Sequence, residues 1–239
     1  MRRRWLRMLT AVAAPIIAFA LPSAPAQGTP GVPVYPGMEV RQGTNVCTLG
    51  YVDPQMRIAF TAGHCRAPNG QVSDRDGNMI GAQALFRDNT PNGATIDTNY
   101  QIADWEAISL SPDVVINNIL PGGRQLVADP AIVPVAGMPV CHFGVVTGES
   151  CGTIQAVYNG WFTMANGVVS QKGDSGGPVY SLTPDGRAAI IGMFNSTWGQ
   201  YPAAVSWQSA SQQAREDVIS AASGSVGAPT PEPWSAPAP

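Results

Sequence analysis

Turn-forming sequences recur along the chain and divide it into short apolar segments. They are Pro68-Asn69-Gly70, Asp76-Gly77-Asn78, Pro91-Asn92-Gly93, Pro121-Gly122-Gly123 and Pro184-Asp185-Gly186. Each favours a turn, because proline presets φ and glycine or asparagine accepts a positive φ. Short strands at this spacing are typical of a barrel or a sandwich, and 239 residues fit one all-β domain.

The segments between the turns predict eight strands and one helix. The strands are expected at 45–52, 56–61, 79–86, 107–110, 151–158, 161–169, 179–182 and 188–194. A single amphipathic helix is expected near the C-terminus, where apolar residues recur at helical spacing after a capping Ser206. These residues are Trp207, Ala210, Ala214, Val218 and Ala221.

The N-terminus predicts an export signal over residues 1–26. Four arginines stand in the first seven residues, an apolar run follows at 9–21, and Ala24-Pro25-Ala26 offers cleavage after Ala26. An uncleaved anchor is the alternative, although the run is shorter than the roughly 20 residues that a membrane-spanning helix needs. The arginine-rich start also weakly resembles a twin-arginine signal, so the export route stays open. We expect a secreted or cell-envelope protein without stable membrane association once the signal is removed.

Composition divides the rest of the chain into three parts. Residues 27–40 are rich in Pro and Gly and predict an extended leader. Residues 41–222 form the folded domain. Residues 223–239 consist mainly of Gly, Ala, Ser and Pro, which cannot bury much apolar surface and predict a disordered tail.

The four cysteines and the low charge limit the possible partners. An even number of cysteines in an exported protein favours two disulfides, for which three connectivities are possible. A zinc site is the competing interpretation, and it is weak because there is no C-x-x-C pair and only two histidines, His64 and His142. The net charge of −3 and a charged fraction of 12% provide no basic field for nucleic acid.

The strongest chemical signal is Gly173-Asp174-Ser175-Gly176-Gly177-Pro178. A serine hydroxyl becomes a useful nucleophile only when the backbone presents it beside a base. The flanking glycines allow a tight turn and close approach of a substrate, and they leave the amides of Gly173 and Ser175 free to bind an oxyanion. The alternative is a Gly-rich surface turn, but a six-residue string of this kind is rare.

Two further residues complete a candidate triad. His64 stands in Thr61-Ala62-Gly63-His64-Cys65, at the end of an apolar strand, where it can act as the base. Asp104 is flanked by apolar residues, which suits a buried carboxylate that orients the histidine. Its local rivals, Asp97 and Asp113, lie in polar, turn-like sequence.

Taken together, these motifs resemble the chymotrypsin-like serine proteases, in which histidine, aspartate and serine follow in this order. The segment with Cys141 and Cys151 looks like the bacterial branch that includes streptogrisins and α-lytic protease. The resemblance covers about residues 41–222. It implies two six-stranded antiparallel β-barrels with the triad between them, and the disulfides Cys47–Cys65 and Cys141–Cys151.

The chain departs from this family at several positions. Glu106 stands where relatives usually carry a small residue two positions after the aspartate. By the same resemblance Val169, Asn195 and Thr197 line the substrate pocket, with Asn195 replacing a serine and Thr197 a glycine. Val169 takes the place of the acid of trypsin-like members, so we expect cleavage after small or medium apolar residues.

His142 occupies the position where bacterial relatives carry an arginine that pairs with the aspartate before the nucleophile. We therefore expect a protonated His142 to support Asp174 as a structural ion pair.

The sequence predicts a secreted serine-type endopeptidase that acts on protein or peptide substrates through an acyl-enzyme. Triad chemistry needs no metal or other cofactor, and a monomer is expected. The rival from another class is a catalytically weak or inactive binding protein on the same fold, favoured by Glu106 and the altered substrate strand. An esterase with a G-x-S-x-G elbow is excluded, because in that fold the serine precedes the acid and the histidine.

Overall fold

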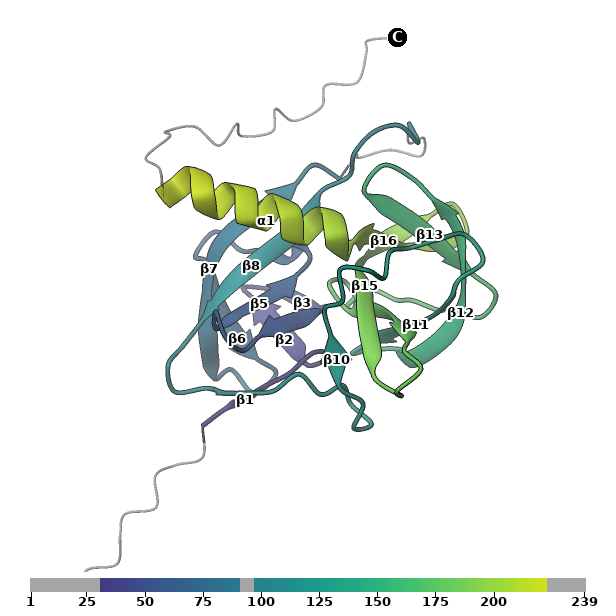
Figure 1. Cartoon of the computed structure of the whole chain (residues 1–239). Helices are drawn as coiled ribbons and strands as arrows, with labels where there is room; N and C mark the ends of the chain where they lie inside the picture. Colours follow the sequence, from purple (N-terminus) through teal and green to yellow (C-terminus); the bar gives the residue numbers. More distant parts are fainter. Residues whose placement is uncertain (1–30, 91–96, 223–239) are drawn as a thin grey trace, which may run out of the picture. The chain divides into compact units, whose positions relative to one another are not determined.

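The computed structural model describes residues 31–90 and 97–222 (Figure 1). The predicted signal peptide at 1–26, the turn that begins at Pro91 and the predicted tail at 223–239 lie outside these ranges. Residues 31–40 of the predicted leader belong to the fold itself, because Val34 and Val40 are completely buried. The folded domain therefore begins before residue 41, and only residues 27–30 of the leader remain outside the description.

The N-terminal β-unit is a curled sheet of seven strands in the order β3-β2-β6-β7-β8-β5-β4. The strands are β2 (Glu39–Gln42), β3 (Asn45–Thr48), β4 (Tyr51–Asp53), β5 (Ile58–Thr61), β6 (Gln71–Asp74), β7 (Met79–Asp88) and β8 (Asp104–Leu110). All the ladders are antiparallel. Within the described residues no ladder joins the outer strands β3 and β4, so hydrogen bonding leaves this sheet open.

The C-terminal β-unit closes on itself. Its strands follow the order β15-β14-β11-β12-β13-β16, and β16 pairs back with β15 to complete a six-stranded antiparallel barrel. They are β11 (Pro139–Gly144), β12 (Gly148–Val157), β13 (Trp161–Ala165), β14 (Pro178–Leu182), β15 (Ala188–Trp198) and β16 (Tyr201–Ser206). The short strand β10 (Leu126–Val127) adds to β15 in parallel.

Three elements lie outside these two sheets, namely the strands β1 and β9 and the helix α1. Strand β1 (Pro33–Val34) pairs in parallel with β9 (Val115–Ile116). The helix α1 (Trp207–Ala222) lies across β7 and β8 (Figure 1). Its buried Ala210 and Ala214 join a core cluster that also contains Trp105 of the N-terminal unit and Trp161 of the C-terminal unit. One continuous core therefore holds the helix and both units together.

The predicted fold class is confirmed: the protein is mostly β, with two curled β-units and one C-terminal helix. The N-terminal unit differs from a six-stranded barrel in detail, since it has seven strands and is open. Sequence reasoning missed strands β1, β2, β6, β9, β10, β11 and β16, and it joined β3 and β4 into one strand. β6 has only four residues, of which three are polar, and β16 contains Pro202, so neither carries a clear apolar alternation.

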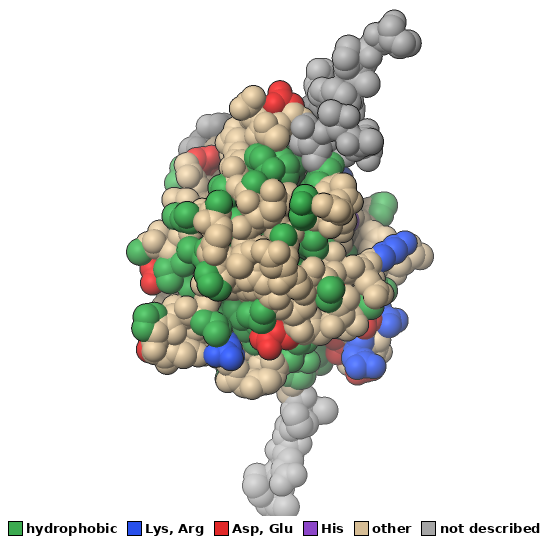
Figure 2. Space-filling view, turned by 90° about the vertical axis from the view of Figure 1, so that its right-hand side faces the viewer, with side chains coloured by type: hydrophobic (Ala, Val, Ile, Leu, Met, Phe, Trp, Pro, Cys, Tyr) green, Lys and Arg blue, Asp and Glu red, His purple; other side chains and the backbone are tan. Residues whose placement is uncertain are grey.

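Figure 2 shows the face of the molecule that the C-terminal β-unit forms. Hydrophobic side chains are scattered there among uncharged polar groups, and the visible charged side chains lie mainly toward the edge of the view. No helix of the described residues is long and apolar enough to cross a membrane.

Candidate active site

His64 is presented by a single 3₁₀ turn, η1 (Gly63–Cys65), that directly follows β5. The turn packs tightly against the neighbouring strands. A Cβ atom at Gly63 would lie 2.3 Å from the carbonyl oxygen of Arg87 and 3.0 Å from the amide nitrogen of Trp105. Glycine is therefore required before the histidine, and it allows His64 to sit directly beside the start of β8.

Asp104, the first residue of β8, holds both the backbone and the ring of His64. Its Oδ2 lies 2.7 Å from Nδ1 of His64, and its Oδ1 accepts the main-chain N–H of His64 at 2.8 Å. The carboxylate is completely buried. Since Nδ1 faces the carboxylate, it carries the proton in neutral His64 and leaves Nε2 free as a base. The rivals Asp97 and Asp113 are exposed and do not contact His64.

Two opposing effects set the pKa of His64. Burial lowers it, but the hydrogen bond and charge of Asp104, together with the charge of Asp88, outweigh burial and raise the pKa above the ordinary value of 6.5. Asp104 thus stabilises the imidazolium that forms when the histidine accepts a proton.

Ser175 lies in a loop with two glycines in the left-handed region, Gly173 at φ 106° and Gly176 at φ 84°. A Cβ atom at Gly176 would lie 2.1 Å from Oγ1 of Thr61, so the loop needs glycine there for space as well as for conformation. The amides of Gly173 and Ser175 have no hydrogen-bond partner among the described residues. They are available to bind a developing oxyanion.

Thr48, at the end of β3, anchors the nucleophile loop from the N-terminal unit, and sequence reasoning missed it. Its hydroxyl donates to the carbonyl oxygen of Gly173 at 2.9 Å, and its amide donates to the carbonyl oxygen of Ser175 at 2.8 Å. These bonds hold the carbonyl groups of the same two residues whose amides are free. Thr61 in turn donates its hydroxyl to the carbonyl oxygen of Thr48 at 2.8 Å.

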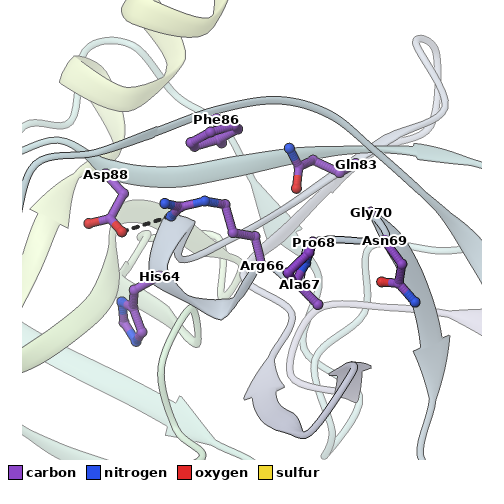
Figure 3. A pocket seen from close by; sticks show the side chains of 9 residues that line it. All are labelled: His64, Arg66, Ala67, Pro68, Asn69, Gly70, Gln83, Phe86 and Asp88. Carbon is purple, nitrogen blue, oxygen red and sulfur yellow. Dashed lines mark hydrogen bonds and ion pairs between the residues drawn. The ribbon is translucent and has the colours of Figure 1, made fainter. Parts of the chain in front are cut away.

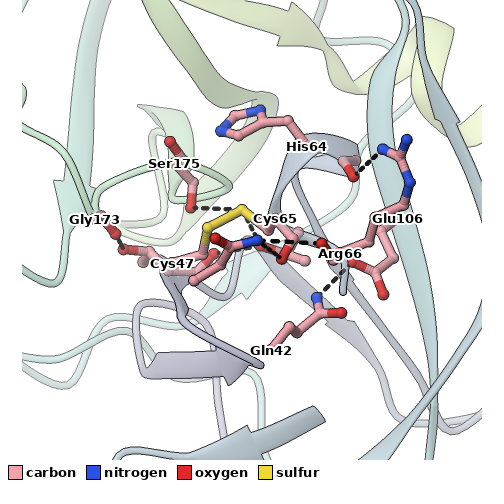
Figure 4. Close-up of a disulfide and its surroundings, with 12 residues drawn as sticks. Gln42, Cys47, His64, Cys65, Arg66, Glu106, Gly173 and Ser175 are labelled. Carbon is pink, nitrogen blue, oxygen red and sulfur yellow. Dashed lines mark hydrogen bonds between the residues drawn. A yellow bond between two sulfur atoms is a disulfide. The ribbon is translucent and has the colours of Figure 1, made fainter. Parts of the chain in front are cut away.

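His64 and Ser175 lie on the same side of the nearby disulfide, and the imidazole points toward the serine side chain (Figure 4). No hydrogen bond joins Ser175 Oγ to His64 in the described parts of the chain. Such contacts are often long in enzymes without substrate and tighten in the complex.

Asp174 is completely buried, and its carboxylate accepts four hydrogen bonds, none of them from His142. They are the amides of Val146 (2.9 Å), Thr147 (3.2 Å) and Gln171 (2.7 Å), and the hydroxyl of Thr147 (2.8 Å). The local segments 146–147 and 171–174 therefore form the support of the nucleophile loop.

The expected ion pair between His142 and Asp174 is absent. Both ring nitrogens of His142 lack a hydrogen-bond partner among the described residues, and the ring packs 4.9 Å from that of Phe194. Burial lowers the pKa of His142 to about 4, against weaker opposing effects from Asp174 and from the main chain of Val169 and Asp174. His142 is thus neutral at physiological pH and cannot replace the arginine of the bacterial relatives.

Asn195 faces the triad rather than a substrate pocket. It is buried, and its Nδ2 donates to Oδ2 of Asp104 and, at 3.4 Å, to Oγ1 of Thr90. Oδ2 of Asp104 therefore accepts from Asn195 as well as from His64. Asn195 thus supports the acid, a role that the resemblance did not predict.

The other two predicted pocket residues lie at the surface. Val169 is 52% exposed, and its main chain binds the hydroxyl of Ser150. The hydroxyl of Thr197 lies 3.3 Å from that of Ser170, which joins β15 to the segment before the nucleophile.

An open pocket of about 570 Å³ adjoins His64 (Figure 3). Arg66 lies across it, with its guanidinium 4.3 Å from the ring of Phe86 and 2.7 Å from a carboxylate oxygen of Asp88. Gln83 and Asn69 also line the pocket, so it offers carboxamide groups but little net charge.

The structure contains the disulfides Cys47–Cys65 and Cys141–Cys151. The first lies directly beside His64 and the main chain of Ser175, and the second joins directly opposite residues of β11 and β12. Cys47, His64 and Cys65 form the one group of metal-ligand type in the described residues. Because both sulfur atoms are in a disulfide, they are not available as the thiolates that zinc prefers.

The two β-units and the site between them define the class: the protein has the chymotrypsin-like fold of bacterial serine proteases. Among solved structures it is similar to the Nocardiopsis protease NAPase, at TM-score 0.53 and 21% identity, over 73% of this chain and 92% of that one. A chymotrypsin of Cellulomonas bogoriensis matches at TM-score 0.52 and 20% identity, over 80% of this chain and 96% of that one. The scabies mite inactivated protease paralogue S-I1 also matches, at TM-score 0.51 and 14% identity, over 76% and 93% of the two chains.

The chain belongs to the same family as the uncharacterized protein Rv1815 of Mycobacterium tuberculosis H37Rv. The two are 56% identical over 203 residues, which cover 85% of this chain and 91% of the relative. The uncharacterized protein MT1863 of strain CDC 1551 matches to the same extent. No protein-family model matches the chain.

Proposed function

We propose that the protein is an exported serine endopeptidase with the triad His64, Asp104 and Ser175. The observation that carries this proposal is the double contact of Asp104 with His64, beside a serine loop whose Gly173 and Ser175 amides are free. This arrangement supplies a base of fixed tautomer, a nucleophile and an oxyanion site, which together are the requirements of acyl transfer.

The reaction proceeds in two halves. Ser175 Oγ attacks the peptide carbonyl and gives its proton to Nε2 of His64, while the Gly173 and Ser175 amides bind the oxyanion. His64 then protonates the leaving amine, and an acyl-enzyme remains on Ser175. A water molecule, deprotonated by His64, hydrolyses this ester and restores the serine. Asp104 stabilises the imidazolium in both halves, and Asn195 keeps the carboxylate in place.

Two contacts suggest the substrate class. The Ser170–Thr197 hydroxyl pair stands where the sequence resemblance places the substrate pocket, so we expect it to favour a small residue on the acyl side of the cleaved bond. The pocket beside His64 can take a flanking side chain of the substrate. Its carboxamides and its neutralised Arg66 favour an uncharged polar residue there.

Export is supported by two disulfides and by the basic, then apolar, N-terminal sequence. Disulfides persist mainly outside the reducing cytosol.

A binding protein on a protease fold is the second candidate. The similarity to an inactivated paralogue means that fold alone does not decide activity. The missing Ser175–His64 hydrogen bond and the Thr197 hydroxyl favour this candidate, whereas the complete triad opposes it.

Labelling with a fluorophosphonate probe tests the proposal. The exported protein should be labelled at Ser175 and should cleave a peptide library, and Ser175→Ala should abolish both activities while keeping the far-ultraviolet circular dichroism of the parent. If the folded parent is neither labelled nor active on any peptide, the protein is a binding protein instead.

A further inference from the structure

Glu106 is a completely buried carboxyl group that the proposed reaction does not use. It lies on β8 opposite Thr61 of β5 and Phe86 of β7. Side chains alternate along a strand, so Glu106 points to the same face as Asp104 and Ile108. Ile108 belongs to the apolar core of the N-terminal unit, and Glu106 therefore faces that core.

Its partner is Gln42, the last residue of β2. Nε2 of Gln42 donates to Oε2 of Glu106 at 2.6 Å. β2 and β8 are not neighbours in the sheet, so this bond crosses the inside of the curled unit. Figure 4 shows the pair beside the Cys47–Cys65 disulfide, close to the segment that carries His64.

Two oxygen atoms that lack a partner bear on the protonation state of Glu106. Oε1 of Gln42 and Oε1 of Glu106 are both buried, and neither has a partner in the described chain. A carboxylate only accepts hydrogen bonds, whereas a carboxylic acid also has one O–H to donate. One proton on Glu106 would let it donate to Gln42 while it accepts from Gln42. The same proton would therefore pair both orphaned atoms, whose burial is otherwise costly.

Charges around Glu106 do not favour its ionised form enough to offset burial. The charge of Arg66 favours the ionised form of Glu106, and Asp88 holds that guanidinium at 2.7 Å. On the same face of β8 stands Asp104, whose negative charge opposes ionisation of Glu106. Gln42, Thr61 and Phe86, which face Glu106 from β2, β5 and β7, are uncharged. Burial raises the pKa of Glu106 from 4.5 to about 7, against the opposing effects of Gln42 and Arg66.

We propose that Glu106 remains protonated in the folded protein up to about neutral pH and forms a two-bond acid–amide pair with Gln42. The pair joins β2 to β8 across a sheet that its own ladders leave open. Deprotonation in mildly alkaline solution breaks one of the two bonds and leaves an unpaired charge in the core. The pair thus makes the N-terminal unit a pH-sensitive element, independently of whether the protein is an enzyme.

The sign of the effect follows from proton binding. Between pH 4.5 and about 7 the folded state holds a proton on Glu106 that the unfolded state has released, so stability falls as pH rises through this window. The shift corresponds to a loss of about 300-fold in the folding equilibrium constant at the alkaline end.

Glu106→Gln isolates this effect, because a carboxamide can make both bonds to Gln42 and cannot ionise. Urea unfolding of the parent and of the variant should be measured from pH 5 to pH 8. The stability of the variant relative to the parent should rise by about 70-fold in the equilibrium constant across this range, since a loss of about 4-fold is already present at pH 5. Glu216→Gln, on the exposed side of α1, controls for the loss of one carboxylate and should not show this rise.

A measurement on the unmodified protein keeps the proposal testable if Glu106→Gln does not fold. Infrared spectra of the parent, with glutamate labelled at the side-chain carboxyl carbon, should show a protonated carboxylic acid at pH 6 that disappears above pH 8. Detection of only ionised glutamates at pH 6 would overturn the proposal. A stability difference between parent and variant that is independent of pH would overturn it as well.

Discussion

The two β-units enclose their cores in different ways. The C-terminal unit is closed by a continuous ring of ladders, whereas the N-terminal unit is open between β3 and β4. Links between side chains complete the N-terminal unit: the Cys47–Cys65 disulfide and the Gln42–Glu106 hydrogen bond. The open unit carries the acid and base of the candidate triad, and the closed unit carries the nucleophile loop. Asp104 can stay buried in the open unit because its carboxylate accepts hydrogen bonds from His64 and Asn195.

Each unit also buries one titratable side chain that its surroundings keep neutral. Burial raises the pKa of Glu106 in the N-terminal unit to about 7 and lowers that of His142 in the C-terminal unit to about 4. Glu106 therefore costs stability as pH rises, and His142 costs stability as pH falls. The protein should therefore lose stability on the alkaline side through Glu106 and on the acidic side through His142.

The largest effect on activity is expected for substitution of Asp104, in the N-terminal unit. Asp104→Asn should lower kcat by about 10³- to 10⁴-fold, because an amide favours the wrong tautomer of His64 and cannot stabilise the imidazolium. Parent activity should rise with pH through the raised pKa of His64, since only the neutral ring acts as a base. Steady-state kinetics from pH 5 to pH 9 measure both the loss of kcat in the variant and the pH dependence of the parent. A loss below about tenfold would remove Asp104 from the triad.

His142 tests the opposite behaviour of the C-terminal unit. Between pH 6.5 and about 4 the unfolded state binds a proton on His142 that the folded state refuses, so parent stability falls with pH in this window. His142→Phe removes this loss, which reaches about 300-fold in the folding equilibrium constant. Urea unfolding from pH 7 to pH 4 measures it. Parallel pH curves for parent and variant would show that His142 is not the buried base inferred here.

Each unit contains one disulfide, so removing each bridge in turn compares how the two units depend on it. Loops of 18 and 10 residues predict that loss of either bridge, by paired Cys→Ser substitutions, costs about 3 kcal/mol of unfolding free energy. Only loss of Cys47–Cys65 should also lower probe labelling, because it adjoins His64 and Thr48. The β11–β12 ladder should keep its register without the Cys141–Cys151 bridge, because further residue pairs on both sides of it join the two strands. Equal loss of labelling in both variants would contradict this difference between the units.

The smallest effect is expected for substitution of Thr48, which joins the N-terminal unit to the nucleophile loop. Thr48→Val keeps the size of the side chain but removes the hydrogen bond that the hydroxyl donates to Gly173 and the one that it accepts from the amide of Val145, and with them part of the support of the oxyanion amides. We expect kcat to fall by about 10- to 100-fold with little change in KM, as for the loss of a positioning bond. Thr183→Val, in an exposed turn, is the matched control. A change confined to KM would mean that Thr48 affects binding only.

Local sequence patterns were sufficient to predict the fold class, the helix and the glycines of the site. The turn tripeptides and apolar segments indicated an all-β fold, and helical spacing placed α1 at Trp207, its observed first residue. The strands that were missed are short or polar, or contain proline, and they depend on neighbours to complete their hydrogen bonds. The glycines around Ser175 and before His64 were readable because the backbone itself requires glycine there.

The sequence by itself determined the β-rich class and the three residues of the candidate triad, since both depend on local patterns of residue type. Only the tertiary structure decided which groups support them. Asn195 binds Asp104, Thr48 anchors Gly173, and amides and a hydroxyl from segments 146–147 and 171 hold Asp174 in place of His142. These partners are far apart along the chain or use backbone groups that every residue has, so no sequence pattern marks them. The protonation of Glu106 and His142 follows from burial, which exists only once the sheets have folded around them.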